Sequence, residues 1–164
     1  MKKLIFIIFV LSSFAALAAS DCSFNFKDFH SLLVQKSKKF KVLKPENKDD
    51  ISKTVTQQAK LRTGEDLIFV GGGCAHISYS FTYSKIKFKT KTVQEQFQKA
   101  RDLLAKSDIQ KGYFEVLMTA IDQALKKPIQ KSKTDVYDLK CGDAMCSLDL
   151  SSKNSLKLNY SFAL

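Results

Sequence analysis

The segment Gly71-Gly72-Gly73-Cys74-Ala75-His76 holds the residues whose types and spacing come closest to a chemical site. A cysteine thiolate two residues from a histidine could act as a nucleophile beside a general base. Three successive glycines could also place backbone amides around an anion. However, a phosphate loop normally opens a helix and carries a lysine followed by a hydroxyl, whereas this segment leads into an alternating strand pattern. We therefore expect a turn or bulge that brings Cys74 to its disulfide, with His76 on the polar face of a strand.

A second group of candidate binding residues is a run of alternating lysines, namely Lys85, Lys87, Lys89 and Lys91. In an extended backbone these side chains share one face, and Ile86 and Phe88 lie on the other. Such a stripe could bind a polyanion, with His76 as a further candidate. The alternative is an edge strand whose lysines prevent aggregation. Lysine far outnumbers arginine in the chain, which favours diffuse electrostatic attraction over bidentate recognition, and we expect no nucleic-acid partner.

Four cysteines occur in the chain, and they are Cys22, Cys74, Cys141 and Cys146. An even number in an exported chain favours two disulfides over a metal cluster or free thiols. Three pairings are possible. We favour Cys141 with Cys146, because the residues between them have the composition of a turn. That pairing leaves Cys22 with Cys74.

No motif for a catalytic site, a metal site or a cofactor emerges from the residues. The two histidines lack His-x-x-x-His spacing, and the cysteines are expected to be paired, so we expect no metal. The chain has no Gly-x-Ser-x-Gly elbow. Four aspartates near the C-terminal end are interpreted as turn formers or surface residues: Asp135, Asp138, Asp143 and Asp149. Two carboxylates that converge in space, as in a glycosidase, stay an open alternative.

Residues 1–20 have the pattern of a secretory signal peptide. Lys2 and Lys3 precede an apolar stretch, and Ala16-Leu17-Ala18 provides the small residues typical of a signal-peptide cleavage site. We expect a periplasmic or extracellular protein without stable membrane insertion, since this segment is too short to span a bilayer. Residues 21–164 are expected to form a single domain. Without the two leading lysines the chain has 25 basic and 16 acidic residues, a formal charge of +9 that attracts anionic partners.

The elements that must position these residues follow from apolar periodicity. We expect a short amphipathic helix over Asn25–Lys36 and then a solvated connection over Lys36–Asp50. Two antiparallel strands should follow between Lys53 and Val70, joined by a turn at Thr63–Asp66. The segment Ala75–Tyr83 alternates most clearly and predicts a half-buried strand with a wet, hydroxyl-rich face. A bulge or a new strand is expected near Ser84 and Lys85.

Two amphipathic helices are expected next. Thr92-x-x-Glu95 has the spacing of a capping box before one apolar stripe, and Tyr113 begins a second, wider stripe that ends before Pro128. Three alternating segments then predict a closing meander of strands. Tyr-Ser-Phe occurs at Tyr79 and again at Tyr160, which we attribute to two inward-facing strands of one sheet. The predicted fold is α+β, with a predominantly antiparallel sheet of about six strands, two or three amphipathic helices and two disulfides.

These features favour an exported protein that acts by binding and is not an enzyme. The first expectation is recognition of a macromolecular partner, in the manner of an envelope inhibitor or immunity protein, because disulfide-stiffened sheets provide rigid faces. One alternative is a protein that binds a polyanion of the envelope, such as lipopolysaccharide or an anionic glycan, through the lysine stripe. The other is an enzyme acting on cell-wall or glycan material through an unrecognised carboxylate or His76 site.

Overall fold

The computed structural model describes residues 39–49, 53–73, 76–88, 92–107 and 113–163, and the structural statements below concern these residues. Nine elements follow one another along the chain: β1 (Phe40–Asp49), β2 (Thr54–Leu61), β3 (Asp66–Gly72), β4 (His76–Ser84), α1 (Val93–Lys106), α2 (Tyr113–Leu125), β5 (Val136–Cys141), β6 (Ala144–Asp149) and β7 (Ser155–Ala163).

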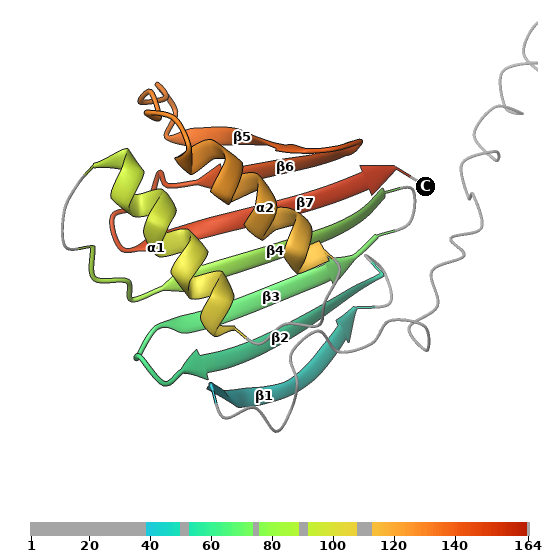
Figure 1. Cartoon of the computed structure of the whole chain (residues 1–164). Helices are drawn as coiled ribbons and strands as arrows, with labels where there is room; N and C mark the ends of the chain where they lie inside the picture. Colours follow the sequence, from blue (N-terminus) through green and yellow to red (C-terminus); the bar gives the residue numbers. More distant parts are fainter. Residues whose placement is uncertain (1–38, 50–52, 74–75, 89–91, 108–112, 164) are drawn as a thin grey trace, which may run out of the picture.

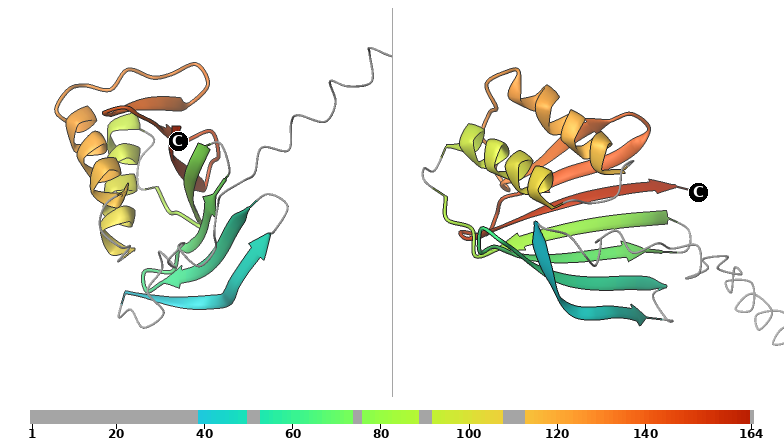
Figure 2. Two further views of the ribbon diagram at one scale, coloured as in Figure 1. Left: turned by 90° about the vertical axis from the view of Figure 1, so that its right-hand side faces the viewer. Right: turned by 60° about the horizontal axis from the view of Figure 1, so that its bottom comes forward.

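The strands form one seven-stranded antiparallel sheet in the order β1-β2-β3-β4-β7-β6-β5. Two meanders meet at its centre, where β4 pairs with β7 from His76 to Ser84. The helices connect the two meanders, and both lie on one face of the sheet (Figures 1 and 2). The other face is covered by no described element, so the fold is a two-layer α+β arrangement.

Successive side chains along each strand alternate between the two faces of the sheet. Val55, Gln57, Ala59 and Leu61 of β2 are buried, and the residues between them are more exposed. The same alternation recurs in the other central strands, so one face of the sheet is apolar. That face and the buried stripes of the helices form one core, in which the largest wholly buried side chains are Tyr83, Phe69, Phe81 and Phe97.

The N-terminus of α1 is the predicted capping box. The Thr92 hydroxyl accepts a hydrogen bond from the Glu95 amide and donates one to the Glu95 carboxylate, at 3.4 and 2.6 Å. Phe97 and Leu104 then face the core, and Phe97 meets Tyr137 of β5 edge to face with 5.2 Å between ring centroids. The apolar stripe of α1 is therefore what holds it across the sheet.

The predicted α+β class with an antiparallel sheet is confirmed, as are both helices after Thr92 and the closing three-strand meander. The expected count of about six strands is one too low for the described residues. The prediction of a solvated connection over Lys36–Asp50 is wrong for Phe40–Asp49, which form β1. This strand lies at the sheet edge, where its register shifts twice along β2 and only one flank is paired. The helix predicted for Asn25–Lys36 lies outside the described residues.

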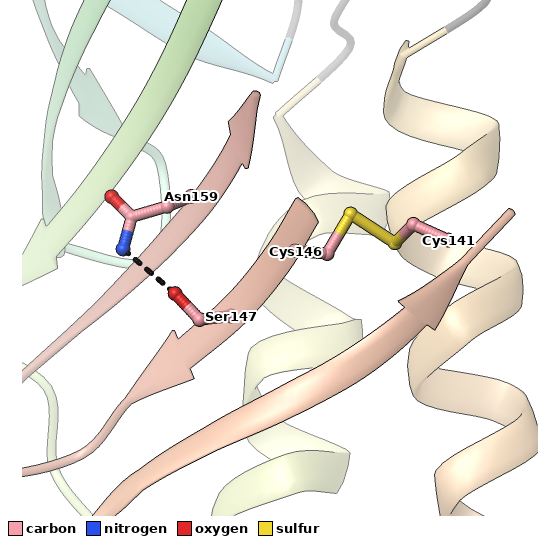
Figure 3. The surroundings of a disulfide bond; sticks show 4 residues. All are labelled: Cys141, Cys146, Ser147 and Asn159. Carbon is pink, nitrogen blue, oxygen red and sulfur yellow. Dashed lines mark hydrogen bonds between the residues drawn. A yellow bond between two sulfur atoms is a disulfide. The ribbon is translucent and has the colours of Figure 1, made fainter. Parts of the chain in front are cut away.

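The Cys141–Cys146 disulfide is present and spans the β5–β6 hairpin (Figure 3), with the two Cα atoms 6.0 Å apart. Gly142 makes the turn possible, because its φ of 66° lies in the left-handed region. Both cysteines are buried on the helix side of the sheet. On the opposite face of the sheet, the Asn159 amide of β7 donates a hydrogen bond of 3.1 Å to the Ser147 hydroxyl of β6 (Figure 3). Cys22 and Cys74 lie outside the described residues, and their pairing stays a prediction.

The glycine triplet ends β3 instead of forming part of a helix. Gly72 and Gly73 both have positive φ, at 131° and 127°. A Cβ on Gly72 would lie 2.2 Å from the Lys53 carbonyl oxygen, so the backbone of the neighbouring turn packs where a side chain would be. The expected turn before β4 is therefore confirmed at Gly72 and Gly73, and its glycines are required by close backbone approach.

Candidate functional site

The structure places the predicted binding residues in two separate regions. His76 is exposed at the beginning of β4, on the uncovered face, as expected for a histidine on the polar side of a strand. Lys85 and Lys87 follow the end of the same strand. Ser84 lies eight residues beyond His76, which corresponds to roughly 26 Å of strand. His76 and these lysines therefore do not belong to one site. Lys89 and Lys91 lie outside the described residues.

Lys85 and Lys87 do not continue a strand, although their alternation with buried residues is as predicted. Lys85 adopts a left-handed conformation with φ of 60°, which ends β4. Ile86 is buried, Phe88 is half-buried, and the two lysines are exposed. The lysines thus lie on the connection between β4 and α1 and are not part of a flat charged strand.

This connection forms one wall of a cleft of about 810 Å³ at the end of the sheet where β4 and β6 finish. We call it the lysine cleft. Its charged and polar lining comes from the β4–α1 connection, the first turns of α1, the segment before β5 and the β6–β7 loop, and comprises Lys85, Lys87, Gln96, Lys131, Asp135, Ser151, Ser152, Lys153 and Asn154. Ile86, Phe88, Val93 and Leu150 provide its apolar lining.

The lysine cleft carries a formal charge of +3, from four lysines and Asp135. Lys85 pairs with Asp66 of β3 at 2.6 Å, yet its side chain remains 66% exposed. Within the described part of the chain, Lys87, Lys131 and Lys153 make no ion pair. Their ammonium groups are therefore available to an anion, and the hydroxyls of Ser151 and Ser152 add uncharged hydrogen-bond donors to the same cleft.

Backbone hydrogen bonds hold the walls of the lysine cleft together. The Ile86 amide donates to the Asn154 carbonyl at 3.0 Å, which joins the β4–α1 connection to the β6–β7 loop. The Leu150 amide donates to the Asp135 carbonyl at 2.8 Å, which joins the end of β6 to the segment before β5. Residues far apart in sequence are thus fixed around one space, a preorganisation that reduces the entropy lost on binding.

Polar contacts on the sheet also fix α1, whose first turns line the cleft. Lys99 donates a hydrogen bond of 2.8 Å to the Glu65 carboxylate, which is 7% exposed and also accepts one from Thr63. Burial raises the pKa of Glu65, but the hydrogen bonds from Lys99 and Thr63 outweigh it, so the pKa lies below its ordinary value. Between the helices, Arg101 pairs with Asp122 at 2.5 Å, and this hydrogen bond raises the pKa of Arg101.

A buried hydroxyl pair holds the other end of α1. The phenol of Tyr83 on β4 lies 2.7 Å from the hydroxyl of Ser107, the C-cap of the helix. Ser107 in turn donates to the Leu103 carbonyl at 2.6 Å. Burial raises the pKa of Tyr83, so the phenol stays protonated and can donate.

A second depression of about 560 Å³ adjoins the lysine cleft and shares Val93 and Lys131 with it. It lies between the start of α1 and the end of α2, and its remaining lining comprises Thr92, Gln94, Leu125, Lys126, Lys127, Pro128 and Ile129. The two spaces together gather six lysines and one aspartate.

The uncovered face of the sheet is a separate candidate. Its central strands present short hydroxyl and amide side chains, among them Thr56, Gln58, Ser78, Ser80, Thr82, Ser84, Ser147, Asn159 and Ser161. Among the described residues, Ile68, Val136 and Met145 are large apolar residues exposed on it, at 38, 40 and 67%, and Leu43 of the edge strand β1 is 49% exposed. They lie on four strands, and β4 and β7, whose side chains on this face are mostly hydroxyls and amides, separate β1 and β3 from β6 and β5. The centre of this face is therefore polar, unlike the apolar centre typical of a protein interface.

The sequence predicts Lys85 and Lys87 as binding residues, but it does not indicate Lys153 and does not relate Lys131 to the other lysines of the cleft. Lys126, Lys127 and Lys131 are close together in sequence, but nothing in a single sequence relates them to residues some 40 positions earlier. Lys153 sits in the turn Ser151-Ser152-Lys153-Asn154, whose composition indicates a loop. Only the pairing of β4 with β7 brings that loop beside Lys85.

The chain matches no protein-family model, and no curated protein or solved structure is significantly similar to it. Neither described helix is long and apolar enough to cross a membrane. No cluster of three histidine, cysteine, aspartate or glutamate side chains in the described ranges is arranged to hold a metal ion.

Proposed function

We propose that this is an exported binding protein that holds an anionic component of the cell envelope, such as lipopolysaccharide or an anionic glycan, in the lysine cleft. The observation that carries the proposal is the convergence of Lys85, Lys87, Lys131 and Lys153 around one space of about 810 Å³. This size falls within the range of small-molecule binding sites. Three of the four ammonium groups have no ion-pair partner among the described residues, so an anion meets little competition.

The proposal assigns binding and not catalysis to the site. The side chains that surround the cleft supply positive charge and uncharged donors, which suits the recognition of phosphate, sulfate or carboxylate groups. The export of the chain rests on residues 1–20, which have the pattern of a signal peptide. An exported basic protein meets anionic lipids and glycans more often than nucleic acid.

The test is a titration of the protein with inorganic polyphosphate, in which calorimetry measures the affinity at several salt concentrations. The variant Lys87→Gln/Lys131→Gln/Lys153→Gln removes three charges from the cleft. At about 1 kcal/mol per lysine near an anionic surface, it should bind about a hundredfold more weakly. The matched control Lys60→Gln/Lys140→Gln/Lys157→Gln removes three exposed lysines from the other face. Equal losses in the two variants would show that only net charge matters, and the proposal would fail.

A protein partner at the uncovered sheet face is the second candidate function, and the observation that favours it is the extent of sheet that none of the described helices covers on this side (Figure 2). Replacing Ser80 and Thr82 with arginine would obstruct the centre of this face without touching the core. Capture of a specific envelope protein by the parent chain, lost in this variant and kept in the lysine-cleft variant, would support this candidate. Capture that survives the arginines would exclude it.

A further inference from the structure

Resting on the anion-binding function above, we propose that the lysine cleft and the second depression together hold one acylated sugar bisphosphate, the chemistry of a phosphoglycolipid headgroup. The lysine cleft takes one phosphate and the sugar, and the second depression takes the other phosphate and the start of an acyl chain.

Positive charge is distributed between two connected spaces. The lysine cleft has a formal charge of +3, and the second depression has Lys126, Lys127 and Lys131 with no acidic residue in its lining. Val93 and Lys131 belong to both linings, so the spaces adjoin. A ligand with a single phosphate would leave one lysine group without a counter-charge, whereas two phosphates on one molecule satisfy both groups.

The uncharged residues that line the two spaces differ in chemistry. The lysine cleft contains the donors Ser151, Ser152 and Asn154, which suit the hydroxyls of a sugar. The second depression contains Leu125, Pro128 and Ile129 beside the shared Val93. Leu125 and Ile129 are half-buried. An anionic polysaccharide would leave this apolar wall in water, but an acyl chain would cover it. The lining therefore favours a glycolipid over a glycan.

The backbone segments that carry the lysines of the two spaces are joined to each other. The Gln94 side chain donates a hydrogen bond of 3.1 Å to the Leu125 carbonyl and so joins the start of α1 to the end of α2. The amides of Lys126 and Lys127 each donate to a carbonyl one turn back in α2, at 3.3 and 3.4 Å. Once the first phosphate is bound, a second phosphate on the same molecule is therefore held near Lys126 and Lys127, which raises its effective concentration.

The experiment measures three probes by fluorescence titration: a glucosamine disaccharide with one phosphate, the same disaccharide with two, and the bisphosphate with short acyl chains, kept below its critical micelle concentration. We expect the second phosphate to improve affinity roughly tenfold to a hundredfold, as in bivalent binding. The acyl chains should improve it at least about tenfold more, through burial of apolar surface.

Two double variants separate the two spaces. Lys126→Gln/Lys127→Gln should remove most of the gain from the second phosphate and weaken the monophosphate several times less than the bisphosphate. Lys87→Gln/Lys153→Gln should weaken all three probes. The control Lys60→Gln/Lys157→Gln should change none of them, and an unfolding midpoint equal to that of the parent chain shows that each variant is folded.

Different results of these titrations would contradict different parts of the proposal. A monophosphate that binds as tightly as the bisphosphate would overturn the two-space inference and leave the anion-binding function intact. A bisphosphate that binds equally well with and without acyl chains would show that the occupant is a glycan and not a glycolipid. If none of the three probes binds but polyphosphate does, the glycolipid inference is wrong, and if polyphosphate also fails to bind, the anion-binding function itself is wrong.

Discussion

The hydrogen bond between Tyr83 and Ser107 provides the sharpest test of how α1 is held in place, and hence of how the lysine cleft is built. Both residues are completely buried, and their oxygens lie 2.7 Å apart. Within the described residues the phenol of Tyr83 has no other hydrogen-bond partner, whereas Ser107 also donates to the Leu103 carbonyl. The two residues are therefore not equivalent when either is replaced.

Replacing Ser107 with alanine leaves a phenol hydroxyl buried without a partner. Such a group costs about 1 to 3 kcal/mol of the free energy of unfolding, or several degrees in the unfolding midpoint of a domain of this size. Replacing Tyr83 with phenylalanine removes the hydroxyl itself, and Ser107 keeps its bond to Leu103. That variant should lose only about 0.5 to 1.5 kcal/mol.

The double variant Tyr83→Phe/Ser107→Ala completes the cycle. Since it contains no unpartnered phenol, its loss should be smaller than the sum of the two single losses by about 1 kcal/mol or more. Urea unfolding followed by circular dichroism at neutral pH measures all four proteins. Strictly additive losses, or a Ser107→Ala variant as stable as the parent, would show that this contact does not fix the helix.

Three further predictions concern stability. Replacing Lys99 with methionine should cost about 1 to 3 kcal/mol of the free energy of unfolding at neutral pH, because it leaves the Glu65 carboxylate without its cation. Since the pKa of Glu65 is lowered in the folded protein, this carboxylate contributes fully to stability above its ordinary pKa of 4.5, and the contribution disappears as the pH falls through the folded pKa. Urea unfolding that shows an equal loss at pH 7 and pH 3 would contradict this explanation. Gly72→Ala should abolish or severely reduce folding, because the added Cβ would lie 2.2 Å from the Lys53 carbonyl oxygen. Gly142 has open space around it, so Gly142→Ala should cost only about 1 kcal/mol of stability, for its left-handed φ. Thermal unfolding that ranks the two variants the other way would contradict the turn geometry. Replacing Cys141 and Cys146 together with alanine should cost about 2 kcal/mol, the value for a short closed loop, and a variant as stable as the oxidised parent in urea would show that the bridge contributes nothing.

The central strands and both helices follow from the sequence because they bury one regular face. In β4 the alternation from Ile77 to Tyr83 matches the observed burial, and the Thr92 capping box marks the start of α1. Where the hydrophobic period is uninterrupted, local pattern and tertiary packing agree.

The edge strand β1 could not be predicted in this way. Apart from Phe40 and Val42, its described side chains are exposed, and its sequence is rich in lysine and contains a proline. These are the residues that edge strands use to avoid pairing with other chains, and they are also the residues of solvated loops. Composition alone does not distinguish the two.

The site is predictable only in part for a similar reason. Lys85 and Lys87 stand out by their alternation, but the cleft arises where four segments meet at one end of the sheet. Lys153 comes to this end through the register of β4 with β7, in which Ser84 lies opposite Ser155. Such pairings depend on the topology of the whole sheet and leave no trace in the local pattern.

The most direct measurement of the central claim is a map of amide chemical shifts during titration of the isotope-labelled protein with pyrophosphate. The account predicts saturable shifts concentrated at residues 85–88, 93–96, 131–135 and 150–154, which surround the lysine cleft. Small shifts spread over exposed lysines such as Lys60 and Lys140, or shifts centred on the uncovered face, would contradict it.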